Sequence, residues 1–206
     1  MRFLKIGLTA MLAAMALVAY VGAGTASAAE LYKDINWWPD ETQGTGVRFN
    51  ATLESGTSAV FENAAGTALE TCTGSEMEFL IEKAGENGST YVNPTGSFQN
   101  HTYTGCKNVH VLRFGTWEIR NVKGTNGGLV ISTGTEVTVN TAAGSCVITT
   151  NQTYIGTLTG ANEEKASAKL HVNGALNGTG PFGCPTTARW TATYTVTNLN
   201  GLYVYP

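Results

Sequence analysis

Charged residues are scarce in this chain of 206 residues. Asp, Glu, Lys and Arg make up 13% of it, about half of what an ordinary soluble domain carries, while 42% of the residues are hydrophobic. Such a composition supplies enough apolar side chains for a core and too little charge for a disordered polyelectrolyte. The net charge of −3 also excludes the basic body of a nucleic-acid-binding protein, so we expect no nucleic-acid partner.

Groups that carry chemistry are scarce as well. Aspartate occurs only at Asp34 and Asp40, and no G-x-S-x-G element offers a nucleophile on a strand-to-helix turn. The chain has no phosphate-binding P-loop and no calcium loop, and no two cysteines have the C-x-x-C spacing of a zinc or redox site. We therefore predict no catalytic residue, no metal and no cofactor.

The three histidines of the chain are candidate bases or ligands, but the pattern around each favours another role. His171 alternates with two apolar residues, so we expect it on a solvated strand face. His110 lies between two valines, which indicates a histidine of the core or its rim. His101 lies in a segment whose second copy has no histidine, so the motif does not require it.

Three glutamates share one strand face at two-residue spacing, namely Glu76, Glu78 and Glu82. Paired carboxylates can hydrolyse glycosidic bonds when they face each other across a substrate. A solvated sheet face gives the same spacing, and we prefer that interpretation. A hydrolase with a noncontiguous carboxylate site stays as an alternative function.

The first 28 residues have the three parts of a signal peptide. Arg2 and Lys5 supply a positive start, residues 6–21 are almost entirely apolar, and residues 26–28 (ASA) form a small-x-small cleavage site. No apolar run of 18 residues follows, so we expect no transmembrane segment. The sequence therefore predicts a secreted, extracellular protein, with association to the cell envelope left open.

Four cysteines follow the leader, and an even count in an oxidising compartment predicts two disulfides. A weak repeat suggests the pairing: residues 95–106 and 173–184 share a glycine, a bulky apolar residue two positions later, and a closing Gly-Cys. Each copy follows an earlier cysteine at a similar distance. The expected pairs are Cys72 with Cys106 and Cys146 with Cys184, and each loop closure is worth roughly 3–4 kcal/mol.

Strand patterns dominate the exported part. Apolar and polar residues alternate strictly from 188 to 196, and the pattern places Ala188, Trp190, Ala192, Tyr194 and Val196 on one face. Similar runs occur at 47–53, 76–82, 117–120, 136–139 and 168–172, with Asn-Gly turns between strands. We predict an all-β fold, an antiparallel β-sandwich with a β-barrel as the alternative. Its domain spans 47–206, after a polar lead-in at 29–46.

The stretch from Cys184 to Thr197 (CPTTARWTATYTVT), with Thr104-Gly105-Cys106 after a T-G-S-F element, resembles uncharacterised secreted actinobacterial all-β proteins. The resemblance covers about residues 50–197. It implies an exported, disulfide-bonded, all-β domain and no particular activity. The lead-in and the tyrosine-rich tail lie outside it.

Trp37 and Trp38 stand in the polar lead-in, outside the alternating strands. Exposed indole rings can stack on sugars, so this pair predicts a carbohydrate-binding module as one alternative. The pattern is equally typical of an indole ring that packs over one end of the hydrophobic core. Trp117 and Trp190 lie on alternating strands, where core packing is expected. The leading hypothesis is a non-catalytic protein with a structural or binding role, whose partner is a cell-wall or extracellular polysaccharide or protein.

Peptide mass mapping of the unreduced, exported chain tests the cysteine pairing. We expect two linked peptide pairs, one joining Cys72 to Cys106 and the other joining Cys146 to Cys184. The control is the same digest after reduction, in which both linked masses disappear. A linkage between Cys72 and Cys146 would contradict the half-repeat argument.

Overall fold

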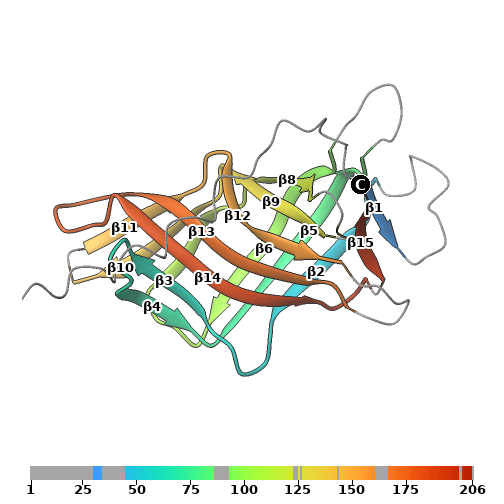
Figure 1. Ribbon diagram of the computed structural model, residues 1–206. Helices are drawn as coiled ribbons and strands as arrows, with labels where there is room; N and C mark the ends of the chain where they lie inside the picture. The colour runs from blue at the N-terminus through green and yellow to red at the C-terminus, as the bar shows by residue number, and fades with distance from the viewer. Residues whose placement is uncertain are drawn as a thin grey trace, which may run out of the picture.

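The computed structural model describes residues 30–33, 45–85, 93–122, 125, 127–142, 144–160, 167–199 and 201–205. Within these residues the chain forms fifteen strands and no helix, and all strand pairs are antiparallel. Figure 1 shows the long strands winding around a common axis. The all-β, antiparallel fold class is therefore confirmed.

The strands follow the chain in fifteen segments: β1 (Glu30–Lys33), β2 (Arg48–Leu53), β3 (Ala59–Asn63), β4 (Ala68–Cys72), β5 (Gly74–Lys83), β6 (Thr95–Thr104), β7 (Val109–Arg113), β8 (Thr116–Asn121), β9 (Gly127–Thr133), β10 (Glu136–Thr141), β11 (Gly144–Thr149), β12 (Thr153–Thr159), β13 (Lys169–Thr179), β14 (Thr187–Val196) and β15 (Leu202–Tyr205).

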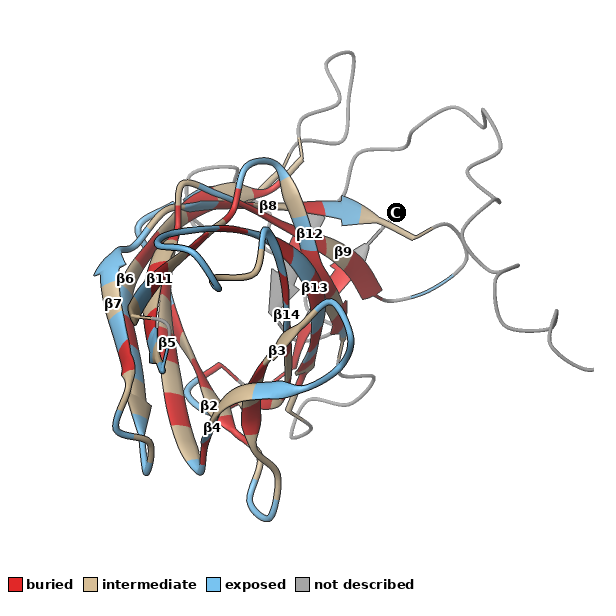
Figure 2. Ribbon diagram, turned by 90° about the vertical axis from the view of Figure 1, so that its left-hand side faces the viewer, coloured by how far each residue is buried: buried red, intermediate tan, exposed pale blue. Residues whose placement is uncertain are grey.

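Eight strands close into a barrel. Strands β14, β2, β5, β6, β8, β9, β12 and β13 pair in that order, and β13 returns to β14 through nine residue pairs. Figure 2 looks along the axis and shows the ring of strands. Of the two architectures that the sequence allows, the chain thus adopts the barrel rather than the sandwich. The physical reason is the β13–β14 pairing, because it joins the free edges that two stacked sheets would keep.

The two strands that close the ring also extend it. Residues 169–172 of β13 pair with β12, and residues 177–179 pair with β11. In the same way, residues 194–196 of β14 pair with β2, and residues 188–191 pair with β3. The hairpin β3–β4 and the ribbon β11–β10–β7 therefore continue the wall beyond the eight-stranded ring, as the left part of Figure 1 shows.

The predicted alternation agrees with the inward faces of the strands. All five apolar residues that the pattern assigns to one face of β14 are buried, and Tyr194 and Val196 have no exposed surface. On the other strands, the residues that alternation assigns to the inward face are buried as well: Phe49, Ala51, Met77, Phe79, Ile81, Trp117, Ile119, Val137, Val139, Leu170 and Val172. Fully burying a large apolar side chain stabilises a fold by about 1.5–3 kcal/mol. The barrel interior is therefore the hydrophobic core.

Both ends of the described chain meet at one end of the barrel, at the right of Figure 1. Strand β1 pairs with β15 in a separate two-stranded sheet. The Leu31 amide donates to the Ala84 carbonyl at 3.0 Å, just after β5, and Leu31, Leu202 and Val204 are buried. Residues 30–33 of the lead-in are thus ordered against the barrel instead of trailing away from it.

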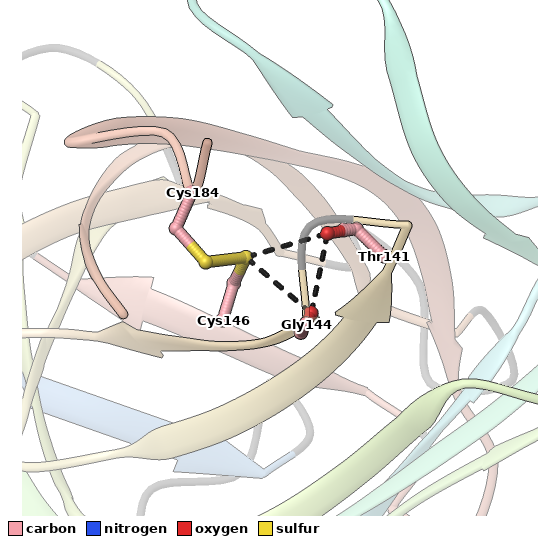
Figure 3. Close-up of a disulfide and its surroundings, with 4 residues drawn as sticks. All are labelled: Thr141, Gly144, Cys146 and Cys184. Atoms are coloured by element: carbon pink, nitrogen blue, oxygen red, sulfur yellow. Dashed lines mark hydrogen bonds between the residues drawn. A yellow bond between two sulfur atoms is a disulfide. The ribbon is translucent and has the colours of Figure 1, made fainter. Parts of the chain in front are cut away.

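The two disulfides have the predicted pairing, Cys72 with Cys106 and Cys146 with Cys184. The first joins the end of β4 to the turn after β6. The second joins β11 to the β13–β14 connection. Figure 3 shows that the β10–β11 turn packs on this second bridge: the Thr141 hydroxyl donates to the Gly144 carbonyl at 3.2 Å and lies 3.7 Å from Sγ of Cys146.

At Gly96 of β6 the backbone packs directly against the core. A Cβ at this position would overlap the Leu80 carbonyl oxygen and the ring of Trp117. We expect Gly96→Ala to lower the free energy of unfolding by about 1–3 kcal/mol or more, because neither the backbone nor the buried indole can move aside easily. Urea unfolding measures this loss.

Thr102→Ala is the matched control on the same strand, since the Thr102 side chain is exposed. Its cost should stay within about 1 kcal/mol, the span of strand propensity. An alanine at position 96 that left the unfolding midpoint unchanged would contradict the close contact.

Candidate functional site

The barrel encloses a cavity, here called the polar chamber, between β5, β6 and β14 on one side and β9–β12 on another. Three of its residues are polar rings (His101, Tyr103 and Trp190), three are hydroxyl residues (Ser132, Thr135 and Thr150), and the rest are apolar. The centre of a water molecule can move through about 20 Å³ of it. One water molecule needs roughly 10–15 Å³ of such space, so the chamber has the size of a hydration site.

His101 lies in the chamber wall with 4% of its surface exposed. Its ring centroid is 4.5 Å from that of Tyr103 and 5.4 Å from that of Trp190. Burial lowers the His101 pKa from its usual 6.5 to about 3, so the imidazole is neutral at physiological pH. Its Nε2 atom has no hydrogen-bond partner among the described residues.

Tyr103 and Trp190 carry two further buried polar atoms, Oη and Nε1, that no described group pairs in acceptable geometry. Burial and the nearby Tyr194 raise the Tyr103 pKa well above its usual value. Tyr194 itself donates to Oγ of Ser75 at 3.0 Å. Burial raises the Tyr194 pKa, and the polar groups of Ser75 and Trp190 offset part of that rise.

Three residues that line the chamber, His101, Tyr103 and Trp190, each hold one buried polar atom that lacks a hydrogen bond in good geometry, and the Trp190 indole is close enough to the Tyr194 hydroxyl to lower the pKa of that tyrosine. A buried donor or acceptor that loses its partner costs about 1–3 kcal/mol. Asn121 at the end of β8, which does not line the chamber, holds two further buried polar atoms without a partner among the described residues.

The hydroxyl residues form a separate, satisfied network. Oγ of Ser132 lies 3.0 Å from Oγ1 of Thr135 and 2.9 Å from Oγ1 of Thr150, and the Thr135 amide donates to the Thr150 hydroxyl at 3.0 Å. All three residues are buried. They tie β9 to the ends of β10 and β11 and add polarity to the chamber without an unpaired group.

No charged residue lines the chamber. It holds neither a carboxylate pair nor a nucleophile beside a base, and the one histidine in it is neutral. Within the part of the chain that the structure describes, no group of three His, Cys, Asp or Glu residues could hold a metal ion. The arrangement has room for a water molecule and no charged group to pair with an ion.

The glutamates of β5 point outward, as a solvated sheet face predicts. Glu76 accepts a hydrogen bond from Asn50 at 3.0 Å, and Glu78 lies 2.5 Å from Arg48. Glu82 accepts a hydrogen bond from Ser97 at 2.7 Å. Each carboxylate is thus paired with a neighbour on the outer wall.

One of the histidine interpretations is confirmed and one was wrong. His171 is exposed on β13, as expected. His110 is exposed rather than in the core or its rim, because β7 turns Val109 inward and the next residue must face out. His101, which the repeat does not require, is buried.

A bulge explains why the sequence pattern missed His101. Phe98 of β6 is buried, so simple alternation would turn residues 100 and 102 inward. The β5–β6 register shifts between the pairs Glu78–Asn100 and Phe79–Phe98, which inserts one extra residue. The shift turns His101 and the partly buried Tyr103 toward the interior instead.

The tryptophans divide into two groups. Trp117 and Trp190 are core residues, as predicted. Trp117 packs edge-on against Phe79 at 5.9 Å, and its indole donates to the Ser97 carbonyl at 3.2 Å. Trp37 and Trp38 lie outside the described residues, together with Asp34 and Asp40.

Comparison with known proteins returns no family model, no curated protein and no solved structure that matches this chain. Among the described residues there is no helix long and apolar enough to cross a membrane. The functional argument therefore rests on the chamber and on the sequence.

The depressed His101 pKa predicts a pH-dependent stability. Between about pH 6.5 and pH 3 the unfolded chain binds a proton at this residue and the folded chain does not, so stability falls as the pH falls. Between pH 7 and pH 5 we expect the free energy of unfolding to decrease by about 2 kcal/mol from this group. His101→Phe should remove that decrease, as measured by urea unfolding at both pH values.

The control is His171→Phe, which removes an exposed histidine of β13 and should leave the pH dependence in place. Equal pH dependence in the wild-type chain and the His101 variant would show that the buried imidazole is not neutral.

Proposed function

We propose that this chain is an exported, non-catalytic β-barrel that functions by binding. The observation that carries the proposal is the polar chamber: a closed, disulfide-bridged barrel keeps three buried polar atoms unpaired around one cavity and places no charged residue there. A fold that needed only stability would gain by replacing such atoms with apolar ones.

Two sequence features support export. Residues 1–28 have the pattern of a signal peptide, and all four described cysteines are joined in disulfides, which persist in oxidising compartments. The hydrolase alternative gains no support from the chamber, whose lining contains no carboxylate. The carbohydrate-binding alternative depends on Trp37 and Trp38, which the structure does not describe.

Fractionation of the source cells, followed by mass analysis of the N-terminus, tests the export. We expect the wild-type chain in the medium or the envelope fraction, beginning at Ala29, because Ala28 ends the small-x-small site. Ala28→Arg should block cleavage and keep the leader on the chain. Ala29→Ser is the matched control, since it lies beyond the site.

Cross-linking in the same fractions identifies the neighbour of the exported chain. A repeatedly recovered wall polymer, protein or small molecule agrees with a binding role. A chain that stays in the cytosol with its leader intact would contradict the proposal.

A further inference from the structure

We propose that the barrel wall opens locally between β6 and β7 when His101 takes up a proton, so that acid gives water access to this part of the interior. The inference goes beyond the proposed binding function and does not depend on it. Three features carry it: a stretch of wall without backbone pairing, a buried imidazole on the strand that borders this stretch, and the absence of any charged group facing that imidazole.

Strands β6 and β7 lie beside each other without pairing, as Figure 2 shows. Strand β6 pairs with β5 from Thr95 to Thr104, but its other edge pairs with β8 only from Thr95 to Ser97. Strand β7 pairs with β10 alone. Residues 99–104 and β7 are called the open seam below. A strand bonded along one edge opens at a lower free energy than a strand bonded along both.

Both ends of the open seam are fixed. At one end the Phe98 amide donates to the Gly115 carbonyl at 3.0 Å. At the other end the turn after β6 carries Cys106, whose disulfide to Cys72 joins this turn to the end of β4. An opening is therefore confined to the part of β6 between Phe98 and Cys106, and the eight-stranded ring need not unfold.

His101 lies in the middle of the β6 edge of the open seam, opposite Met77 of β5, and 4% of its surface is exposed. Its ring packs against those of Tyr103 and Trp190, and its Nε2 atom has no partner among the described residues. A positive charge in such surroundings loses its hydration without gaining a partner. Opening of the seam would return water to a protonated ring.

No charged group faces His101 from the elements packed around it. The lining of the chamber contains no Asp, Glu, Lys or Arg. Glu76 and Glu78 of β5 point to the outer wall, where each has a partner, and His110 of β7 is exposed. The titratable groups nearby are Tyr103 and Tyr194, and burial raises the pKa of both, so they stay neutral in acid. Only water can compensate a proton on His101.

The size of the acid response follows from linkage. Burial holds the His101 pKa at about 3 in the closed wall, while an imidazole exposed by opening regains its usual 6.5. The open form then binds the proton more tightly, so opening is favoured as the pH falls from about 6.5 towards 3. Between pH 7 and pH 5 the equilibrium constant for opening should rise about 25-fold.

Hydrogen exchange of the processed chain in low concentrations of urea tests the proposal at both pH values. The amides that residues 99–104 donate to β5 should open about 25-fold more often at pH 5, after correction for the intrinsic exchange rate. Their exchange should depend little on urea, because a local opening exposes little surface. Residues 170–172 of β13 pair on both edges, so their exchange should depend steeply on urea.

His101→Phe keeps an aromatic ring beside Tyr103 and Trp190 and cannot take up a proton, so it should abolish the 25-fold response. His101→Gln, which is neutral as well, gives the same test if the phenylalanine variant does not fold. His110→Gln is the matched control, because it removes an exposed histidine from the seam itself and should leave the response in place.

Seam amides with the same urea dependence as β13 would show that the opening is global, and would overturn the proposal. A response that persists in the His101 variants overturns it too. Both results leave the exported binding protein intact, because fractionation and cross-linking test that function separately. A cytosolic chain whose seam opens in acid would have the opposite meaning: the opening stands and the proposed function fails.

Discussion

The antiparallel pairing of β13 with β14 is the constraint on which the rest of the molecule depends. Its nine residue pairs close the ring, so that no strand of the eight has a free edge there. Both strands extend beyond the residues that pair within the ring. Their remaining residues pair with β11 and β3, and so attach the ribbon β11–β10–β7 and the hairpin β3–β4. The chamber lies where these two parts meet, with Trp190 of β14 and Leu176 of β13 in its wall.

The disulfides secure the part of the wall where backbone pairing is incomplete. The two edge strands of the sheet, β4 and β7, each pair with one strand only. Cys72 ends β4, and its partner Cys106 stands three residues before β7, so the first bridge holds the two ends of the sheet near each other. The second bridge fastens β11 to the hairpin that closes the ring. The first bridge thus acts where each strand has one paired edge only.

The interior combines two kinds of environment. Around Phe49, Phe79 and Ile119 the lumen is apolar, and its small cavity is lined by hydrophobic side chains alone. Around His101 the lumen holds neutral polar groups, and burial keeps the imidazole uncharged there. The lumen is therefore hydrophobic around Phe49 and carries neutral polar side chains around His101.

Alternation of apolar and polar residues was enough to assign the inward-facing residues of most strands, because a period of two is a local property of the chain, and the half-repeat predicted the cysteine pairs. Local patterns do not show how strongly a sheet curves. The choice between sandwich and barrel became visible only in the strand order, in which the pairing of β13 with β14 joins the two ends of a row of eight strands. Nor could local patterns report the bulge in β6, since a register shift depends on the neighbouring strand. The chamber and its buried histidine follow from that shift, which is why tertiary structure alone revealed the candidate site.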